Sequence, residues 1–312
     1  MTKKLIYPAL GLALMMTAFG CSKNSVSTEG DQAAILALIG ENPEYSGSEV
    51  LSPSDQTLSR VAVDTVKFWW RQLLHRGQII GWGVRRPADS TNPYPSILVT
   101  LTDTLQGILH IVGIDSTDSV HLKKPFTEAA TRRLLFQKRE PDRFRHRGWV
   151  LAGVSGIELI SIYAERLVPS VAEGSRTIPN TAKIDSVKIE SGSASQTVRA
   201  DNILAITLRP DIIELSRGDS INVTVYTGDA TDSVYLHAHV QLGTLPSHRR
   251  KKLVNNGDGS FSGYIRIPSH AGFFGRWHLG VDILKGHVLA SDDLNDYDSR
   301  QWGLLYRVGV PD

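Results

Sequence analysis

The chain has 312 residues, of which 41% are hydrophobic, and its 34 basic and 32 acidic residues leave a formal net charge of +2 at pH 7. This length suits two ordinary domains, and the near balance of charge excludes the strongly basic surface of a nucleic-acid-binding protein. Cys21 is the single cysteine, so no intrachain disulfide can form. We therefore expect domains that are held together by apolar packing alone.

The N-terminus combines a charged start with a short apolar run. Lys3 and Lys4 precede the apolar stretch 5–19, and Gly20 and Cys21 follow it. The stretch is shorter than the about 20 apolar residues that span a bilayer. The pattern is therefore typical of a secretory signal peptide rather than of a membrane-spanning helix.

The segment Ala18-Phe19-Gly20-Cys21 resembles the lipobox of bacterial lipoproteins, although leucine is commoner at the position of Ala18. The resemblance implies that residues 1–20 are removed as a signal peptide and that the thiol of Cys21 is acylated, with palmitate among the attached chains. Acyl chains of this kind hold a protein on a membrane. By the same resemblance, Ser22 implies the outer membrane. The alternative is a plain signal peptide followed by an incidental cysteine.

The next segments are a tether and a first domain. Residues 21–30 are small and polar, which favours a flexible tether. Residues 31–166 follow as the first domain. Its apolar spacing predicts one helix from Asp31 to Gly40 and a longer helix from about residue 54 to Gly77. Alternating residues then predict strands at 97–111, 120–122, 130–136 and 149–163.

Helices that precede a meander of long strands predict an α+β domain in which the helices pack on a curved antiparallel sheet. The segment Arg147-Gly148-Trp149-Val150-Leu151 with Ser155-Gly156, after strand residues Arg132 to Phe136, resembles the last hairpin of cystatin-like and NTF2-like domains. The resemblance implies room for a pocket between helix and sheet.

Three polar residues are candidates to line such a pocket, namely Asp64, His75 and His110. A histidine beside a carboxylate can act as a general base. The sequence shows no nucleophile elbow, phosphate-binding loop or metal motif that would fix their geometry. Surface placement of these three residues is the alternative interpretation.

Residues 167–182 contain two prolines, Gly174 and several small polar residues, and are expected to link the first domain to a second one at 183–312. The second domain shows short alternating strands separated by regular turns, which predicts an all-β sandwich with Trp277 near its centre. Its segment Asn256-Gly257-Asp258-Gly259-Ser260-Phe261-Ser262-Gly263 is similar to hairpins of bacterial immunoglobulin-like domains. We therefore predict an immunoglobulin-like sandwich that lacks the usual cysteine pair.

Two groups of residues could hold a metal ion. Clustered carboxylate and amide oxygens suit calcium, and one loop supplies such oxygens from Asp292, Asp293, Asn295, Asp296 and Asp298. His237 and His239 lie two residues apart on a predicted strand and therefore share a face. Because the opposite face of that strand is apolar, we expect both histidines to face solvent.

Together these features favour a lipid-anchored protein of the cell envelope that binds or scaffolds another protein or a glycan and is not an enzyme. Two alternatives stay open. One is a small-molecule-binding or catalytic pocket in the first domain, and the other is a calcium-dependent adhesion module. The basic segments 138–147 and 248–252 are expected to be soluble hairpin tips.

Overall fold

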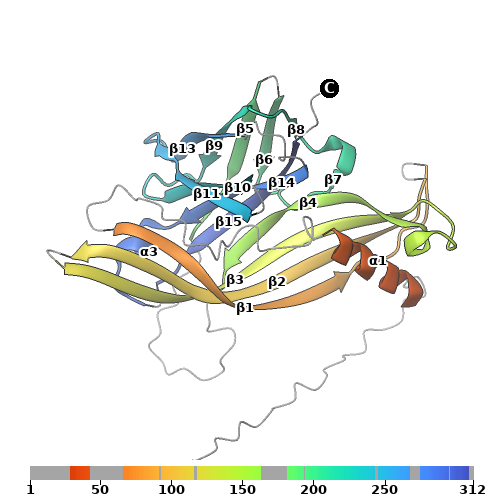
Figure 1. Ribbon diagram of the computed structural model, residues 1–312, viewed down its shortest axis with the longest axis horizontal. Coiled ribbons are helices and arrows are strands. Elements are labelled where there is room, and N and C mark those ends of the chain that lie inside the picture. Colours follow the sequence, from red (N-terminus) through yellow and green to blue (C-terminus); the bar gives the residue numbers. More distant parts are fainter. Residues whose placement is uncertain are drawn as a thin grey trace, which may run out of the picture.

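The computed structural model describes residues 29–42, 66–90, 93–115, 118–162, 181–192, 194–242, 245–267, 275–294 and 296–308. Figure 1 shows their arrangement. The helices are α1 (Glu29–Glu41), η1 (Arg145–Gly148), η3 (Arg209–Asp211) and α3 (Gly286–Ala290), where η denotes a 3-10 helix. The first strands are β1 (Val66–Trp82), β2 (Ser96–Asp115), β3 (Asp118–Lys138), β4 (Trp149–Ser161), β5 (Ser186–Ser191), β6 (Ala194–Arg199) and β7 (Thr207–Leu208). The later strands are β8 (Glu214–Leu215), β9 (Ser220–Tyr226), β10 (Ser233–Leu242), β11 (Leu245–Lys252), β12 (Val254–Asn255), β13 (Ser260–Arg266), β14 (Gly275–Leu284) and β15 (Ser299–Val308). Among the helices of these ranges, none is both long enough and apolar enough to cross a membrane.

The strands form two sheets. The long sheet has ten strands in the order β1-β2-β3-β4-β15-β14-β10-β11, with β7 beside β4 and β8 beside β15. The short sheet has five strands in the order β12-β13-β9-β5-β6. Apart from the parallel pair β8–β15, the pairs are antiparallel. The long sheet therefore combines strands from both halves of the chain, because β4 pairs directly with β15.

The long sheet is rolled, so that its two end strands approach each other. Arg250 of β11 donates a hydrogen bond from Nη2 to the carbonyl oxygen of Trp69 in β1. Its guanidinium carbon lies 3.5 Å from the centroid of the Trp69 ring. Trp69 also packs edge-on against Tyr235 of β10, with ring centroids 5.0 Å apart. The face that carries these side chains, called the inner face below, is thereby enclosed.

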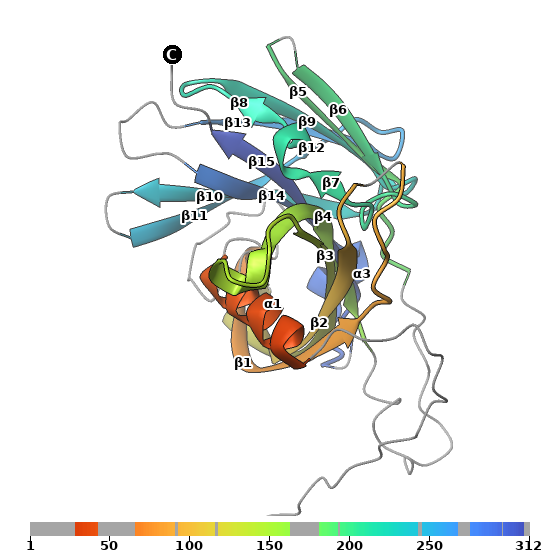
Figure 2. The ribbon, with the colours of Figure 1, turned by 90° about the vertical axis from the view of Figure 1, so that its right-hand side faces the viewer.

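Helix α1 closes one end of the rolled sheet. Figure 2 shows β1–β4 curving around this helix. Ile35, which is 0% exposed, packs in a cluster with Val99, Phe136 and Trp149 from the inner face. Burial of such side chains contributes about 1.5–3 kcal/mol each. The helix is therefore held by its apolar contacts with the sheet.

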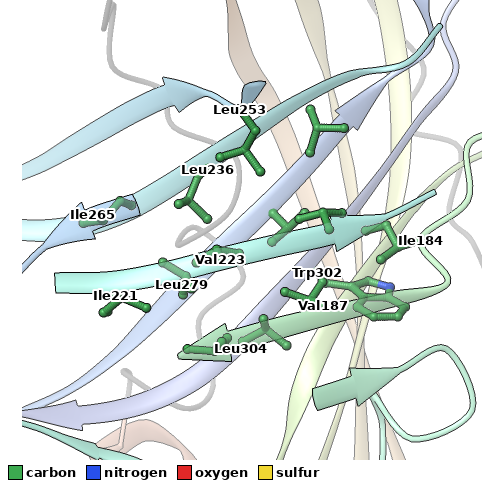
Figure 3. Packing of buried hydrophobic residues seen from close by; sticks show 14 of the residues in the cluster. Ile184, Val187, Ile221, Val223, Leu236, Leu253, Ile265, Leu279, Trp302 and Leu304 are labelled. Carbon is green, nitrogen blue, oxygen red and sulfur yellow. The ribbon is translucent and has the colours of Figure 1, made fainter. Parts of the chain in front are cut away.

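The short sheet covers the opposite face of β10, β14 and β15. Figure 3 shows Val187 and Val223 of the short sheet packed against Leu236, Leu279 and Trp302 of the long sheet. Trp302 is 0% exposed and lies in this core. The sequence points instead to Trp277, whose side chain lies outside the described set.

The predicted fold class is wrong. In the part of the chain that the structure describes, the protein is mostly β, with two sheets, and it does not show an α+β domain of helices packed on a sheet beside a separate sandwich. The reason is the β4–β15 pairing, which joins the meander of the first half to the strands of the second half in one sheet. Single-sequence patterns show which residues form strands, but they do not show which distant strands pair.

The helix predicted between about residue 54 and Gly77 is also wrong wherever the structure describes it. From Val66 onward the chain is strand β1. The period of two was hidden because both faces of β1 carry large rings. Trp69 faces inward and is 0% exposed, whereas Phe68 and Trp70 lie on the outer face and stack on each other at 5.6 Å. The next inward-facing residue after Trp69 is Arg71. A charged residue is not expected in a core, so the sequence does not identify this face as the buried one.

Candidate functional site

Charged residues lie at the centre of the inner face. Arg71 of β1, Glu128 of β3, Asp282 of β14 and His237 of β10 are each between 0% and 2% exposed. The strand register places all four on the same face of the rolled sheet. Charges are rarely buried unless they are paired, because leaving water is costly for an ion.

Arg71 pairs with Asp282 through both arms of its guanidinium. Its Nη1 lies 2.5 Å from Oδ2 of Asp282, and its Nη2 lies 2.9 Å from Oδ1. A two-point contact of this kind is the strong form of an arginine–carboxylate pair. Burial alone would raise the pKa of Asp282, but the charge of Arg71 outweighs it and holds that pKa well below its usual range.

Glu128 forms the second half of this buried network. Its Oε1 accepts hydrogen bonds from the Tyr297 hydroxyl at 2.5 Å, from Ser299 Oγ at 2.7 Å and from Gln301 Nε2 at 2.9 Å. The Tyr297 oxygen in turn accepts a bond from Arg71 Nε at 2.8 Å. Burial raises the pKa of Tyr297 well above 10, and the adjacent Glu128 raises it further. Tyr297 therefore stays neutral and bridges the two charged groups.

His237 extends the network toward the end of the sheet. Its Nε2 lies 3.3 Å from Oδ2 of Asp282. Burial is the main cause that lowers the pKa of His237 below 6.5, although Asp282 acts in the opposite direction. The expectation that His237 faces solvent is wrong, because β1 covers the face of β10 opposite the sandwich core. His239 lies beside His248 in the register of β10 and β11.

This network connects β1 and β3 with β10, β14 and β15. Its hydrogen bonds and ion pairs therefore stabilise the rolled shape of the long sheet. Its charged members are almost completely buried, which leaves no surface for a substrate to reach them. Sequence reasoning missed the network. The available signal was a lone charged residue within an otherwise apolar strand, such as Asp282 between Val281 and Ile283.

The structure does not bring the predicted pocket residues together. His75 is exposed at a bulge of β1, where it lies opposite Gln106. His110 is 6% exposed but belongs to the outer face of β2. Asp64 lies outside the described residues, as does Cys21. A half-open groove of about 450 Å³ exists elsewhere, and neither histidine lines it. Its lining is apolar apart from one acid and consists of Val66, Ile111, Gly113, Ile114, Val120, Leu122, Leu289, Ala290 and Asp292.

The acidic loop is divided between buried and exposed positions. Asp298 is 0% exposed and accepts bonds from Thr181 N at 2.8 Å, Thr181 Oγ1 at 2.7 Å and Ala182 N at 3.1 Å. Asp296 lies 3.1 Å from Nε2 of His287. Asp292 and Asp293 are exposed, and Asn295 is not described. In the part of the chain that the structure describes, no three His, Cys, Asp or Glu side chains gather as metal ligands.

Because Asp296 and Asp298 already have partners within the protein, we expect calcium to leave thermal stability unchanged. Thermal unfolding should give the same midpoint with millimolar calcium and with a chelator. A bound ion would raise the midpoint, since a ligand that binds the folded state alone stabilises it by mass action. The opposite result would be a midpoint that rises by several degrees with calcium in the unaltered protein but not in Asp292→Asn. That result would support a calcium site in this loop.

Comparison with known proteins does not assign the chain to a family. No protein-family model matches the chain, and no curated protein matches it.

Proposed function

We propose that the protein is a lipid-anchored component of the cell envelope with a non-enzymatic binding or scaffolding role. The anchor is Cys21, which follows the signal-like segment 1–20, and the outer membrane is its expected location. Residues 22–28 alone lie between this cysteine and helix α1, which begins at Glu29. The folded part would thus sit close to the membrane surface.

The non-enzymatic role is supported by the burial and pairing of the charged residues inside the rolled sheet, since the groove of about 450 Å³ has an apolar lining with one acid. Helix α1 and its apolar partners occupy one end. Leu105, Ala130 and Leu159 fill the middle, next to the buried network. Trp69 and Phe126 lie in the cluster at the other end. An enzyme needs a concave site where reactive groups meet a substrate, and here the reactive groups are enclosed by packing.

The outer side of β1 offers a surface for a protein partner. Large aliphatic side chains remain exposed at Leu74 (61%), Ile79 (68%) and, just after the strand, Val84 (66%). These side chains lie five residues apart along an extended segment, and exposed apolar side chains can serve as contacts for a partner. We therefore place the contact with a partner along β1.

One experiment in cells tests both parts of this proposal. In the first arm, Cys21→Ser should abolish acylation, so that the protein leaves the membrane fraction and the mature mass changes by the lost acyl chains. Inhibition of lipoprotein signal peptidase should leave the signal peptide attached to the unaltered protein. An unchanged mature mass and unchanged membrane partition in both cases would contradict the anchor.

The second arm cross-links the anchored protein in intact cells. A variant with Leu74→Ser, Ile79→Ser and Val84→Ser should lose a discrete cross-linked species that the unaltered protein forms. The matched control carries Val254→Ser and Tyr264→Ser, which remove exposed apolar side chains (67% and 55%) from the short sheet. Equal cross-linking of both variants would contradict a contact along β1. Thermal unfolding of both variants checks that they remain folded.

A further inference from the structure

An aromatic and histidine cluster lies on the outer face of β1, β2 and β3, away from the buried network. The rings of Trp70 and His110 stack almost in parallel, with an interplanar angle of 2° and centroids 4.5 Å apart. His121 of β3 completes the cluster, with its ring centroid 5.2 Å from that of His110 and 5.6 Å from that of Trp70. His110 is buried beneath these rings, whereas His121 is exposed.

The hydrogen bonds of His110 define which ring nitrogen carries its proton. Its Nε2 lies 2.9 Å from the amide oxygen Oε1 of Gln72. Because that oxygen can only accept, Nε2 must donate, and in the neutral ring Nδ1 is then a hydrogen-bond acceptor. Nδ1 of His110 therefore accepts a hydrogen bond from Nε2 of His121, which lies 3.0 Å away.

We propose that His110 Nδ1 and His121 Nε2 together bind a divalent late transition-metal ion of the copper, nickel and zinc group. Imidazole nitrogens suit these ions, with bonds of about 2.0 Å. Two such bonds separate the nitrogens by about 2.8 Å at a right angle and by about 3.3 Å at the tetrahedral angle. The observed 3.0 Å lies between these values. For both nitrogens to bind, His121 takes the tautomer that carries its proton on Nδ1, and the ion replaces the Nε2 proton between the two rings.

The surroundings of His110 fit a metal ligand. A ligating histidine usually donates its second ring nitrogen to an oxygen acceptor, which fixes the tautomer, and Gln72 supplies that acceptor.

The site has two protein ligands, because no third His, Cys, Asp or Glu joins them within the described ranges. The remaining positions around the ion face solvent beside the exposed His121 and would hold water or a donor from a partner. Lys123 lies opposite His110 in the register of β2 and β3 and opposes the positive charge of the ion. Such a site exchanges its ion readily and is distinct from a closed structural zinc site.

Titration of the mature protein with Cu²⁺ tests the site, because the ion quenches the fluorescence of a nearby tryptophan and Trp70 stacks on the proposed ligand. We expect saturable quenching at one equivalent. His121→Ala should weaken the affinity at least tenfold. Gln72→Leu should weaken it about tenfold, as is typical when the outer partner of a ligand is lost. Lys123→Gln should bind copper at least as tightly as the unaltered protein.

Two histidine variants serve as matched controls. His75→Ala removes an exposed histidine from the same strand, and His239→Ala removes one beside His248 in the β10–β11 hairpin. Both should leave the quenching unchanged. Electron paramagnetic resonance of the bound copper should show coupling to two nitrogens, and one coupling should disappear in His121→Ala. Equal copper affinity of His121→Ala and the unaltered protein, or quenching that never saturates, would overturn the proposal. Since His121 is exposed, its variant should fold even where His110→Ala does not.

Discussion

Replacement of Arg71 by methionine should lower the free energy of unfolding by about 3–5 kcal/mol, the usual cost of removing one partner of a buried ion pair. The loss of stability arises mainly because the two carboxylates stay buried without their cation. Asp282 would lose both of its guanidinium contacts, and Glu128 would lose the cation that lies 3.8 Å from its Oε1. Urea-induced unfolding, followed by tryptophan fluorescence, measures the change.

Two further variants separate this effect from a loss of packing. Arg71→Met combined with Asp282→Leu and Glu128→Gln removes the stranded charges, so it should recover most of the lost stability. Lys188→Met breaks an exposed pair with Glu190, where both side chains are at least 40% exposed, and it should leave the midpoint unchanged. A triple variant that is as unstable as Arg71→Met would show that the charge network is not the cause.

If Arg71→Met does not fold, a milder variant still tests the network. Tyr297→Phe keeps the ring and removes the hydroxyl that joins Arg71 to Glu128. Its expected cost is about 1–3 kcal/mol, because a buried charged donor and a buried charged acceptor each lose a partner. Unchanged stability of Tyr297→Phe would contradict a bridging role for Tyr297.

The second large effect is a fall in stability with acid, in two steps. A group that binds protons more weakly in the folded state than in the unfolded state stabilises the fold at high pH, and this contribution is lost as the pH falls. For His237, whose folded pKa lies below the unfolded value of about 6.5, the loss begins below about pH 7. For Asp282, whose folded pKa lies well below the unfolded value of about 3.9, the loss begins below about pH 5.

Thermal midpoints measured from pH 8 to pH 3 should therefore decline gently at first and steeply below pH 5. His237→Gln should flatten the gentle step and preserve the steep one, because it removes the histidine that must stay neutral when buried. A constant midpoint between pH 8 and pH 5 in the unaltered protein would contradict the first step. A variant curve with the same gentle slope would assign that step to another group, such as His110, whose pKa is also lowered.

The fold was predictable where one face of a strand is apolar and the other is polar. In β9, Ile221, Val223 and Val225 are buried and alternate with polar residues, as the short alternating strands predicted for residues 183–312 require. Helix α1 was predicted at nearly its observed bounds. The prediction failed at β1, where rings lie on both faces, and at β3, whose continuous span was divided into separate strands. In these strands both faces carry large or charged side chains, so alternation alone does not identify the inner face.

The buried network was not predictable, because its members come from strands far apart in the chain. Arg71 and Asp282 are 211 residues apart in sequence, yet they form the central ion pair. From its neighbours in the sequence, each of these two residues would be expected to be an ordinary charged residue on the surface. Only the rolling of the long sheet, which lays β1 over β10 and β14, brings these charges together and removes them from water.

Local residue order and composition are enough to show the alternation of strands such as β9, the absence of an intrachain disulfide bond and the signal-like segment before Cys21. By contrast, the pairing of β4 with β15, the burial of both faces of β10 and β14, and the ion pair of Arg71 with Asp282 become visible only in the folded chain. The physical reason is that a strand shows its own alternation locally, whereas its partner strands, and with them the burial of its second face, depend on contacts made across the whole chain.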